Sequence, residues 1–62
     1  MTDDAESKIR RLRHDIANPL AAILAEAQLL LLNAATLDAE TVAGLKEIES
    51  SVRRIRDLLQ QP

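Results

Sequence analysis

Residues 20–45 read LAAILAEAQLLLLNAATLDAETVAGL, in which one apolar helical pattern ends, a short break follows and a second pattern begins. Apolar residues spaced three and four apart form one stripe along a helix. The stripe before the break contains Ile9, Leu12, Ile16, Leu20, Ile23, Ala27 and Leu30. The stripe after the break contains Val42, Leu45, Ile48, Val52, Ile55 and Leu59. We therefore predict a first helix over about residues 4–32, a connection over about 33–38 and a second helix over about 39–60.

The connection reads NAATLD and ends on a residue that favours helix starts. Asp38, or as the weaker candidate Thr36, can accept hydrogen bonds from the free amides of the second helix. Acid and base four residues apart also predict small stabilising ion pairs on the helices. These pairs are Asp4–Lys8, Glu6–Arg10, Glu49–Arg53 and Arg53–Asp57. Residues 29–32 are apolar on all sides, so we expect this end of the first helix to be covered on more sides than its beginning.

The amino-acid composition also indicates a helical fold. The 62 residues are 47% apolar and contain no aromatic residue and no cysteine. Good helix formers dominate, whereas the residues that fill strands are scarce. So short a chain buries little apolar surface by itself, and it has neither disulfides nor a metal-ligand cluster to compensate. We predict an all-α fold, an antiparallel helical hairpin that forms a homodimeric four-helix bundle.

Charge and hydropathy exclude several classes of partner. The net charge of −2 is spread over both signs, so no basic patch indicates nucleic acid or a membrane surface. The apolar run over 20–35 is too short for a membrane span and is interrupted by Glu26, Gln28 and Asn33. The first residues, MTDDAES, are acidic and polar, unlike a signal peptide. The absence of cysteine fits a reducing compartment. We expect a soluble, cytoplasmic chain.

The only histidine lies in RHDIANPLAAI, residues 13–23. At about 100° per residue, His14 points almost directly away from Ile16 and Ile23, so we expect it to face water. Asn18 follows four residues later and shares the face of His14, within reach of a group bound to the imidazole. A lone exposed histidine is also compatible with a surface position that has no role, and Asn18 with a polar residue tolerated before proline.

Pro19 and Asp15, both near His14, bear on the shape of the helix and on the protonation of the imidazole. Pro19 cannot donate to the carbonyl of Asp15 and crowds it, which predicts a bend one turn after the histidine. A proline inside a helix costs roughly 3 kcal/mol, a penalty that a purely structural helix has no reason to carry. Asp15 is either simple solvated charge or a carboxylate that accepts from Nδ1 and leaves Nε2 free as nucleophile. Adjacent helix positions do not face each other, so this contact requires a particular rotamer.

The run His14-Asp15-Ile16-Ala17-Asn18-Pro19-Leu20 resembles the H-box of bacterial sensor histidine kinases, which has His, an acid, two variable residues, Asn or Thr, Pro and an apolar residue. Residues 20–23 and 47–59 are also similar to the dimerisation and histidine phosphotransfer domain of that family. The resemblance therefore covers nearly the whole chain and identifies a single domain over residues 1–62.

The resemblance implies a role for each H-box residue. His14 would accept the γ-phosphoryl group of ATP and pass it to an aspartate of a response-regulator receiver domain. Asp15 would be its acid/base partner, Asn18 would position phosphate or the hydrolytic water, and Pro19 would permit bending between kinase and phosphatase states. These 62 residues contain no glycine-rich phosphate loop and no magnesium-binding asparagine motif. We therefore expect no bound cofactor and no autophosphorylation, with ATP and Mg²⁺ held by a catalytic domain in cis or in trans.

Ala21, Ala25 and Gln28 continue the His14 face away from the apolar stripe. Small side chains there would let a partner helix lie close, and in the resembled family the receiver docks below the histidine, so these residues are the predicted docking surface. Alanine is also the best helix former, which is a simpler reason for its presence at positions 21 and 25. Two other functions remain open: a structural dimerisation hairpin or receiver-binding antagonist that never carries phosphate, and metal binding by two His14 side chains. The metal site is a poor fit, since one histidine and one acid per chain rarely complete it.

Overall fold

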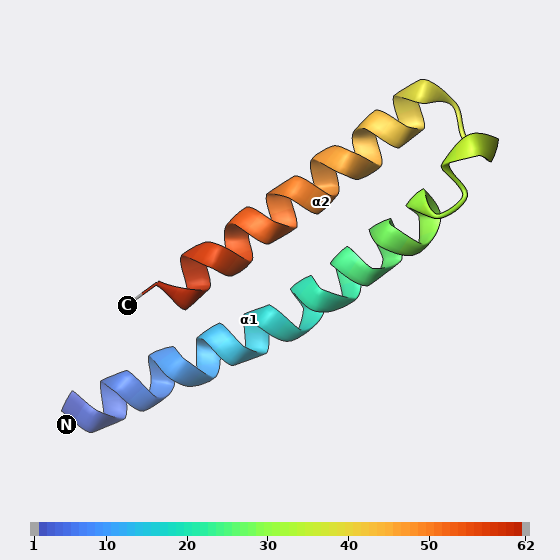
Figure 1. The fold of residues 1–62 in the computed structure, drawn as a ribbon. Coiled ribbons are helices and arrows are strands. Elements are labelled where there is room, and N and C mark those ends of the chain that lie inside the picture. Colours follow the sequence, from blue (N-terminus) through green and yellow to red (C-terminus); the bar gives the residue numbers. More distant parts are fainter. Residues whose placement is uncertain (1, 62) are drawn as a thin grey trace.

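A computed structural model describes residues 2–61. It contains helix α1 (Thr2–Leu31), the short 3₁₀ helix η1 (Ala34–Thr36) and helix α2 (Ala39–Gln60). The two long helices run antiparallel, side by side (Figure 1). The described residues include no strand. The predicted all-α hairpin is confirmed, whereas the four-helix bundle concerns a second copy and stays a prediction.

The connection is held by local hydrogen bonds. The amide of Thr36 donates to the carbonyl of Asn33 over 2.9 Å, and the Thr36 hydroxyl donates to the same oxygen over 2.8 Å. At the start of α2, Oδ1 of Asp38 accepts from the amide of Thr41 over 2.7 Å. This contact satisfies an amide that has no partner inside the helix. Asp38 is therefore the N-cap, as the sequence predicts.

The core of the hairpin is small and coincides only in part with the predicted stripes. Only Leu24, Ala27 and Val52 are buried among the described residues. Ile23 and Leu30, which belong to the predicted stripe, remain exposed. Both sets have helical spacing, so α1 carries two adjacent apolar stripes, and α2 covers the one that contains Leu24. Ala27 of the predicted stripe is buried within one hairpin, whereas Leu24 is a buried residue that the single predicted stripe left out.

Much apolar surface stays uncovered by the hairpin itself. The exposed large apolar residues are Ile9, Leu12, Ile23, Leu29, Leu30, Leu32, Ile48, Ile55 and Leu58. Leu32 is 79% exposed, and Leu29 is exposed as well. Leu29 and Leu32 are therefore not covered within one hairpin, because α2 lies along only one side of α1, and the expectation that residues 29–32 are covered on more sides stays a prediction for the dimer.

Of the four ion pairs predicted on the helix surfaces, one is present. Glu49 pairs with Arg53 over 3.3 Å, as predicted. The other three predicted pairs, Asp4–Lys8, Glu6–Arg10 and Arg53–Asp57, are absent within 4.0 Å over residues 4–61. Exposed pairs gain little Coulomb energy in water and lose side-chain entropy, so their failure to form is unsurprising.

None of the described helices is long and apolar enough to cross a membrane.

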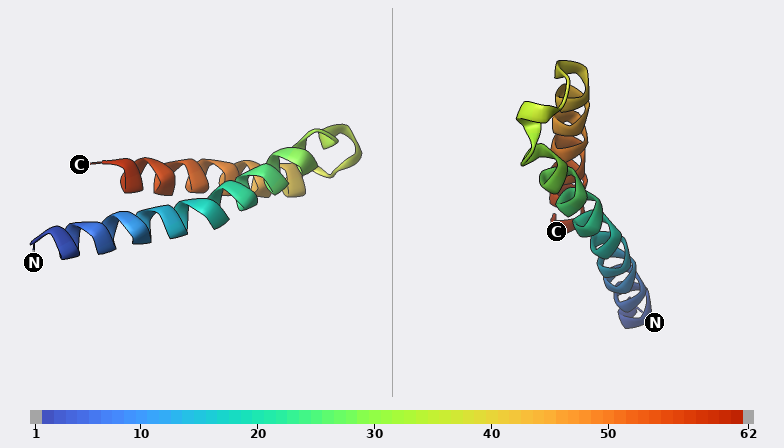
Figure 2. Two further views of the ribbon diagram at one scale, coloured as in Figure 1. Left: turned by 90° about the horizontal axis from the view of Figure 1, so that it is seen from below. Right: turned by 90° about the vertical axis from the view of Figure 1, so that its right-hand side faces the viewer.

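The hairpin is elongated, with extents of 54 × 15 × 11 Å. α1 has 30 residues and α2 has 22, so α1 is longer by about 12 Å at 1.5 Å per residue. Figure 2 shows the N-terminal end of α1 projecting past the end of α2, and the axis of α1 curving between that end and the connection. One end of the hairpin is therefore closed by the connection, and the other is open.

Candidate functional site

His14 lies on α1 near the open end of the hairpin. Gln28 contacts Glu49 across the hairpin, and antiparallel helices advance at equal rates, so His14 lies just past the level of Gln60, the last residue of α2. Its side chain is 76% exposed, as the helical spacing predicts. Ile16, on the opposite side of the helix, is half-buried. The imidazole is thus presented to solvent from a helix whose other side is packed.

Asp15 is the nearest acid to the imidazole. Its Oδ1 lies 4.0 Å from Nδ1 of His14. This distance is too long for a hydrogen bond but short enough for the carboxylate to attract a proton on Nδ1. A proton kept on Nδ1 leaves the lone pair on Nε2, which is the ring nitrogen that can then act as a nucleophile.

Asn18 and Pro19 lie one turn further along α1, and both are exposed. Within residues 4–61 the Asn18 amide makes no hydrogen bond to protein, so it is free to bind a ligand or water. α1 continues through Pro19 without a break. Pro19 nevertheless has no N–H to donate to Asp15, which leaves one missing bond in the ladder beside His14.

The predicted docking residues share the solvent-facing side of α1, but they differ in their contacts. Ala21 and Ala25 are exposed. Gln28 reaches the second helix, where its Nε2 donates to Oε2 of Glu49 over 3.3 Å, and Arg53 donates to the same oxygen over 3.3 Å. The surface below His14 therefore extends from α1 onto α2, which sequence reasoning did not anticipate.

Two leucines that sequence reasoning left out also belong to this surface. Leu29 and Leu32 line a hollow of 430 Å³ together with Ala25 and Gln28. Leu32 follows His14 by 18 residues, about five full turns, so both side chains leave the helix in the same direction. That spacing was a usable signal in the sequence. The His14 side of α1 thus carries apolar surface toward the connection.

The sequence model of one protein family, described as His Kinase A (phospho-acceptor) domain, matches residues 9–61. This range contains His14, the connection and all of α2. The chain belongs to the His Kinase A family. Comparisons with curated proteins and with solved structures found no match.

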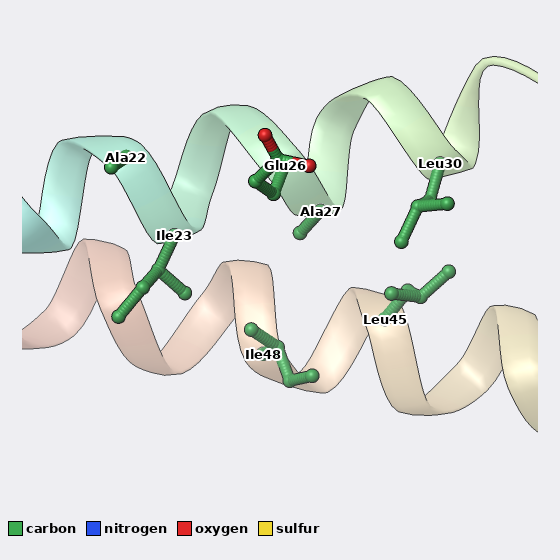
Figure 3. A pocket seen from close by; sticks show the side chains of 7 residues that line it. All are labelled: Ala22, Ile23, Glu26, Ala27, Leu30, Leu45 and Ile48. Atoms are coloured by element: carbon green, nitrogen blue, oxygen red, sulfur yellow. The ribbon is translucent and has the colours of Figure 1, made fainter.

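A second surface of this His Kinase A domain lies away from His14. Figure 3 shows an apolar groove between α1 and α2, with Ile23, Ile48, Leu30 and Leu45 along it and Glu26 as its one charged side chain. The groove has a volume of 320 Å³. Ile23 points about 180° away from His14 on α1, so the groove and the histidine occupy opposite sides of that helix.

The described part of this His Kinase A domain offers no cluster of three or more His, Cys, Asp or Glu side chains that could hold a metal ion. Among the described residues, Asp15 supplies the only carboxylate within 4.0 Å of the His14 imidazole. Stable zinc sites need three or four protein ligands.

Proposed function

We propose that this chain is the phosphoacceptor and dimerisation module of a two-component histidine kinase. His14 accepts a phosphoryl group from ATP held with Mg²⁺ by a separate catalytic domain, in cis or in trans, and passes it to an aspartate of a receiver domain. Membership of the phospho-acceptor family, together with a 76% exposed imidazole on a packed helix, carries the proposal. Because ATP is the phosphoryl source, the proposed reaction is cytoplasmic.

The chemistry requires a free lone pair on the imidazole. Nε2 of His14 attacks the γ-phosphorus, the bond from that phosphorus to the bridging oxygen breaks, and ADP leaves with the electron pair. Asp15 attracts the remaining proton on Nδ1 and so offsets the positive charge that develops on the ring. In the second step a carboxylate oxygen of the receiver attacks the phosphorus, and the N–P bond breaks to regenerate the imidazole.

Asn18 and Pro19 serve the same centre in this proposal. The Asn18 amide, one turn from His14 and without a protein partner, orients the phosphate or the water that hydrolyses the phosphorylated receiver. Pro19 weakens the helix at the carbonyl of Asp15, so α1 bends there more easily between the kinase and phosphatase states. Both roles act on the position of groups near His14 rather than on the stability of the hairpin.

The second copy of this chain covers the groove of Figure 3 in this proposal. A hairpin with three buried apolar residues has too small a core to be stable by itself. The exposed residues Ile23, Leu30 and Ile48 line one face, and a second hairpin buries them in a four-helix bundle. The His14 side of each α1 then remains outside, where a receiver docks over Ala21, Ala25 and Gln28.

A receiver-binding hairpin that never carries phosphate is the competing function, favoured by the exposed leucines beside Ala25 and Gln28. Incubation with a histidine kinase catalytic domain and radiolabelled MgATP separates the two. We expect acid-labile label on this chain, none with MgATP alone, and none in His14→Gln, which keeps its helicity because the side chain is outside the core. Absence of label with an active catalytic domain, or label that survives His14→Gln, contradicts the proposal.

A further inference from the structure

Two arginines stand one helical turn before His14. Arg10 precedes it by four residues and Arg11 by three. At about 100° per residue, Arg10 leaves the helix about 40° to one side of His14 and Arg11 about 60° to the other. Residues at these separations have Cβ atoms about 5–6 Å apart on a helix surface. His14 is therefore flanked by two arginine residues on the side toward the N-terminus.

The direction of helical side chains brings the imidazole of His14 over the turn that carries the two arginines. The Cα–Cβ bonds of a helix tilt toward its N-terminus, so a side chain covers the turn that precedes its own Cα. The imidazole of His14 consequently extends over the turn that contains Arg10 and Arg11. By the same rule Asn18 extends toward His14 from the other side. A phosphoryl group on Nε2 then lies over the turn of Arg10 and Arg11. The arginine side chains tilt toward the N-terminus as well, so they reach its oxygens by folding back toward His14, which their length allows.

Both guanidinium groups are available in the described structure. Over residues 4–61 no carboxylate lies within 4.0 Å of Arg10 or Arg11, and the expected Glu6–Arg10 pair is not formed. Arg10 also borders an open surface hollow of 260 Å³, lined with Glu6, Ile9 and Arg13. Because this part of α1 lies beyond the end of α2, the second helix does not cover it.

We infer that Arg10 and Arg11 bind the phosphoryl group on His14 and assist its transfer. The inference rests on the proposed function and adds two residues to the site. A phosphoryl group brings about two negative charges next to Asp15, whose carboxylate repels it. Guanidinium groups donate paired hydrogen bonds to phosphate oxygens and remain charged throughout. They offset the Asp15 charge and hold the oxygens while the bond to Nε2 forms or breaks.

Phosphoramidate tests this without a catalytic domain. Nε2 of His14 attacks the phosphorus, the P–N bond of phosphoramidate breaks, and ammonia leaves with the electron pair, so no further reactant is needed. The rate of phosphohistidine formation is measured by ³¹P NMR for the whole chain and for the Arg10→Gln/Arg11→Gln double variant. Glutamine is also a good helix former, and circular dichroism verifies the fold. Arg54→Gln, on the exposed surface of α2, removes a charge elsewhere and is the matched control.

We expect the double variant to react about three- to tenfold more slowly than the wild type and Arg54→Gln, as for partly exposed charges a few ångströms apart. The Arg10→Lys/Arg11→Lys variant retains charge and should recover part of the rate. Raising the salt to about 0.5 M should shrink the difference, because salt screens exposed charges. Equal rates in the double variant and in Arg54→Gln at low salt would overturn the inference.

Failure of the proposed function gives a different result. Phosphoramidate reacts with an accessible imidazole whether or not a kinase domain uses it. A normal arginine effect with phosphoramidate, combined with no labelling by any catalytic domain, rejects the kinase role and leaves the arginine site intact. Labelling of His14 by a catalytic domain at a rate that both arginine replacements leave unchanged rejects the arginine site and leaves the proposed function intact.

Discussion

Ile48→Lys should disrupt dimerisation more than any change on the His14 side of the hairpin. Ile48 is 44% exposed in the single hairpin and lines the groove between α1 and α2. If a second copy covers this groove, the exposed part of Ile48 is buried in each of the two hairpins. Lysine removes that apolar contact twice and brings two ammonium groups to a surface that has few polar partners.

The size of the effect follows from the exposed fraction. Burying a whole isoleucine side chain is worth about 1.5–3 kcal/mol, so the remaining 44% is worth about 1 kcal/mol in each copy. Two copies give about 2 kcal/mol, and partial desolvation of two lysines adds about 1 kcal/mol or more. Since about 1.4 kcal/mol corresponds to a factor of ten, the dimer Kd should rise at least about a hundredfold.

Sedimentation and circular dichroism on the same dilution series measure this. Because one hairpin buries so little, mass and helicity should fall together, and Ile48→Lys should move both transitions to higher protein concentration. Leu32→Lys is the control, since it introduces the same charge at a residue that is 79% exposed on the His14 side. An unchanged Kd for Ile48→Lys, or an equal shift for Leu32→Lys, would refute the reasoning.

The remaining predictions concern the site and the cap. Asp15→Ala should slow phosphorylation of His14 by a catalytic domain, measured as initial rate of labelling, without changing helicity. Asn18→Ala should impair receiver dephosphorylation more than His14 phosphorylation; equal losses would argue against a separate hydrolytic role. Ala21→Arg or Ala25→Arg should leave helicity and dimerisation intact but block transfer from phosphorylated His14 to the receiver, and unchanged transfer kinetics in both would remove this face as the docking surface. Hydrogen bonds from Thr41 lower the pKa of the Asp38 carboxyl below its usual value of 3.8. The ionised carboxylate should therefore stabilise the fold fully above pH 3.8, and this stabilisation should be lost as the pH falls through the lowered pKa. Thermal melts of Asp38→Ala should lack this pH dependence.

Local features of the fold were predictable from the sequence, and features that depend on how two helices meet were not. Asp38 caps α2 because its contact to Thr41 spans three residues and needs no tertiary information. The choice between Ile23 and Leu24 as the packed residue depends on where α2 lies, and both satisfy a helical period. The Gln28–Glu49 hydrogen bond joins residues 21 apart, and only the register of the hairpin brings them together.

The candidate site also has features that the sequence predicts and features that it does not. Exposure of His14 follows from its angle to Ile16 on one helix, and the structure bears it out. The 4.0 Å separation of His14 and Asp15 depends on the rotamers of two exposed side chains, which no spacing rule determines. The hollow beside Ala25 was missed because residues 29–32 were interpreted as covered, although Leu32 repeats the direction of His14 after five turns.

Identification of the atom that carries the phosphate tests the central claim most directly. The chain is labelled with ¹⁵N at histidine, phosphorylated by a histidine kinase catalytic domain with MgATP, and observed by ³¹P and ¹⁵N NMR before and after a receiver domain is added. We predict a phosphorus–nitrogen coupling at Nε2 of His14 that disappears as the receiver gains an acyl phosphate. No phosphate on His14, or phosphate that stays there while the receiver remains unmodified, would contradict the account.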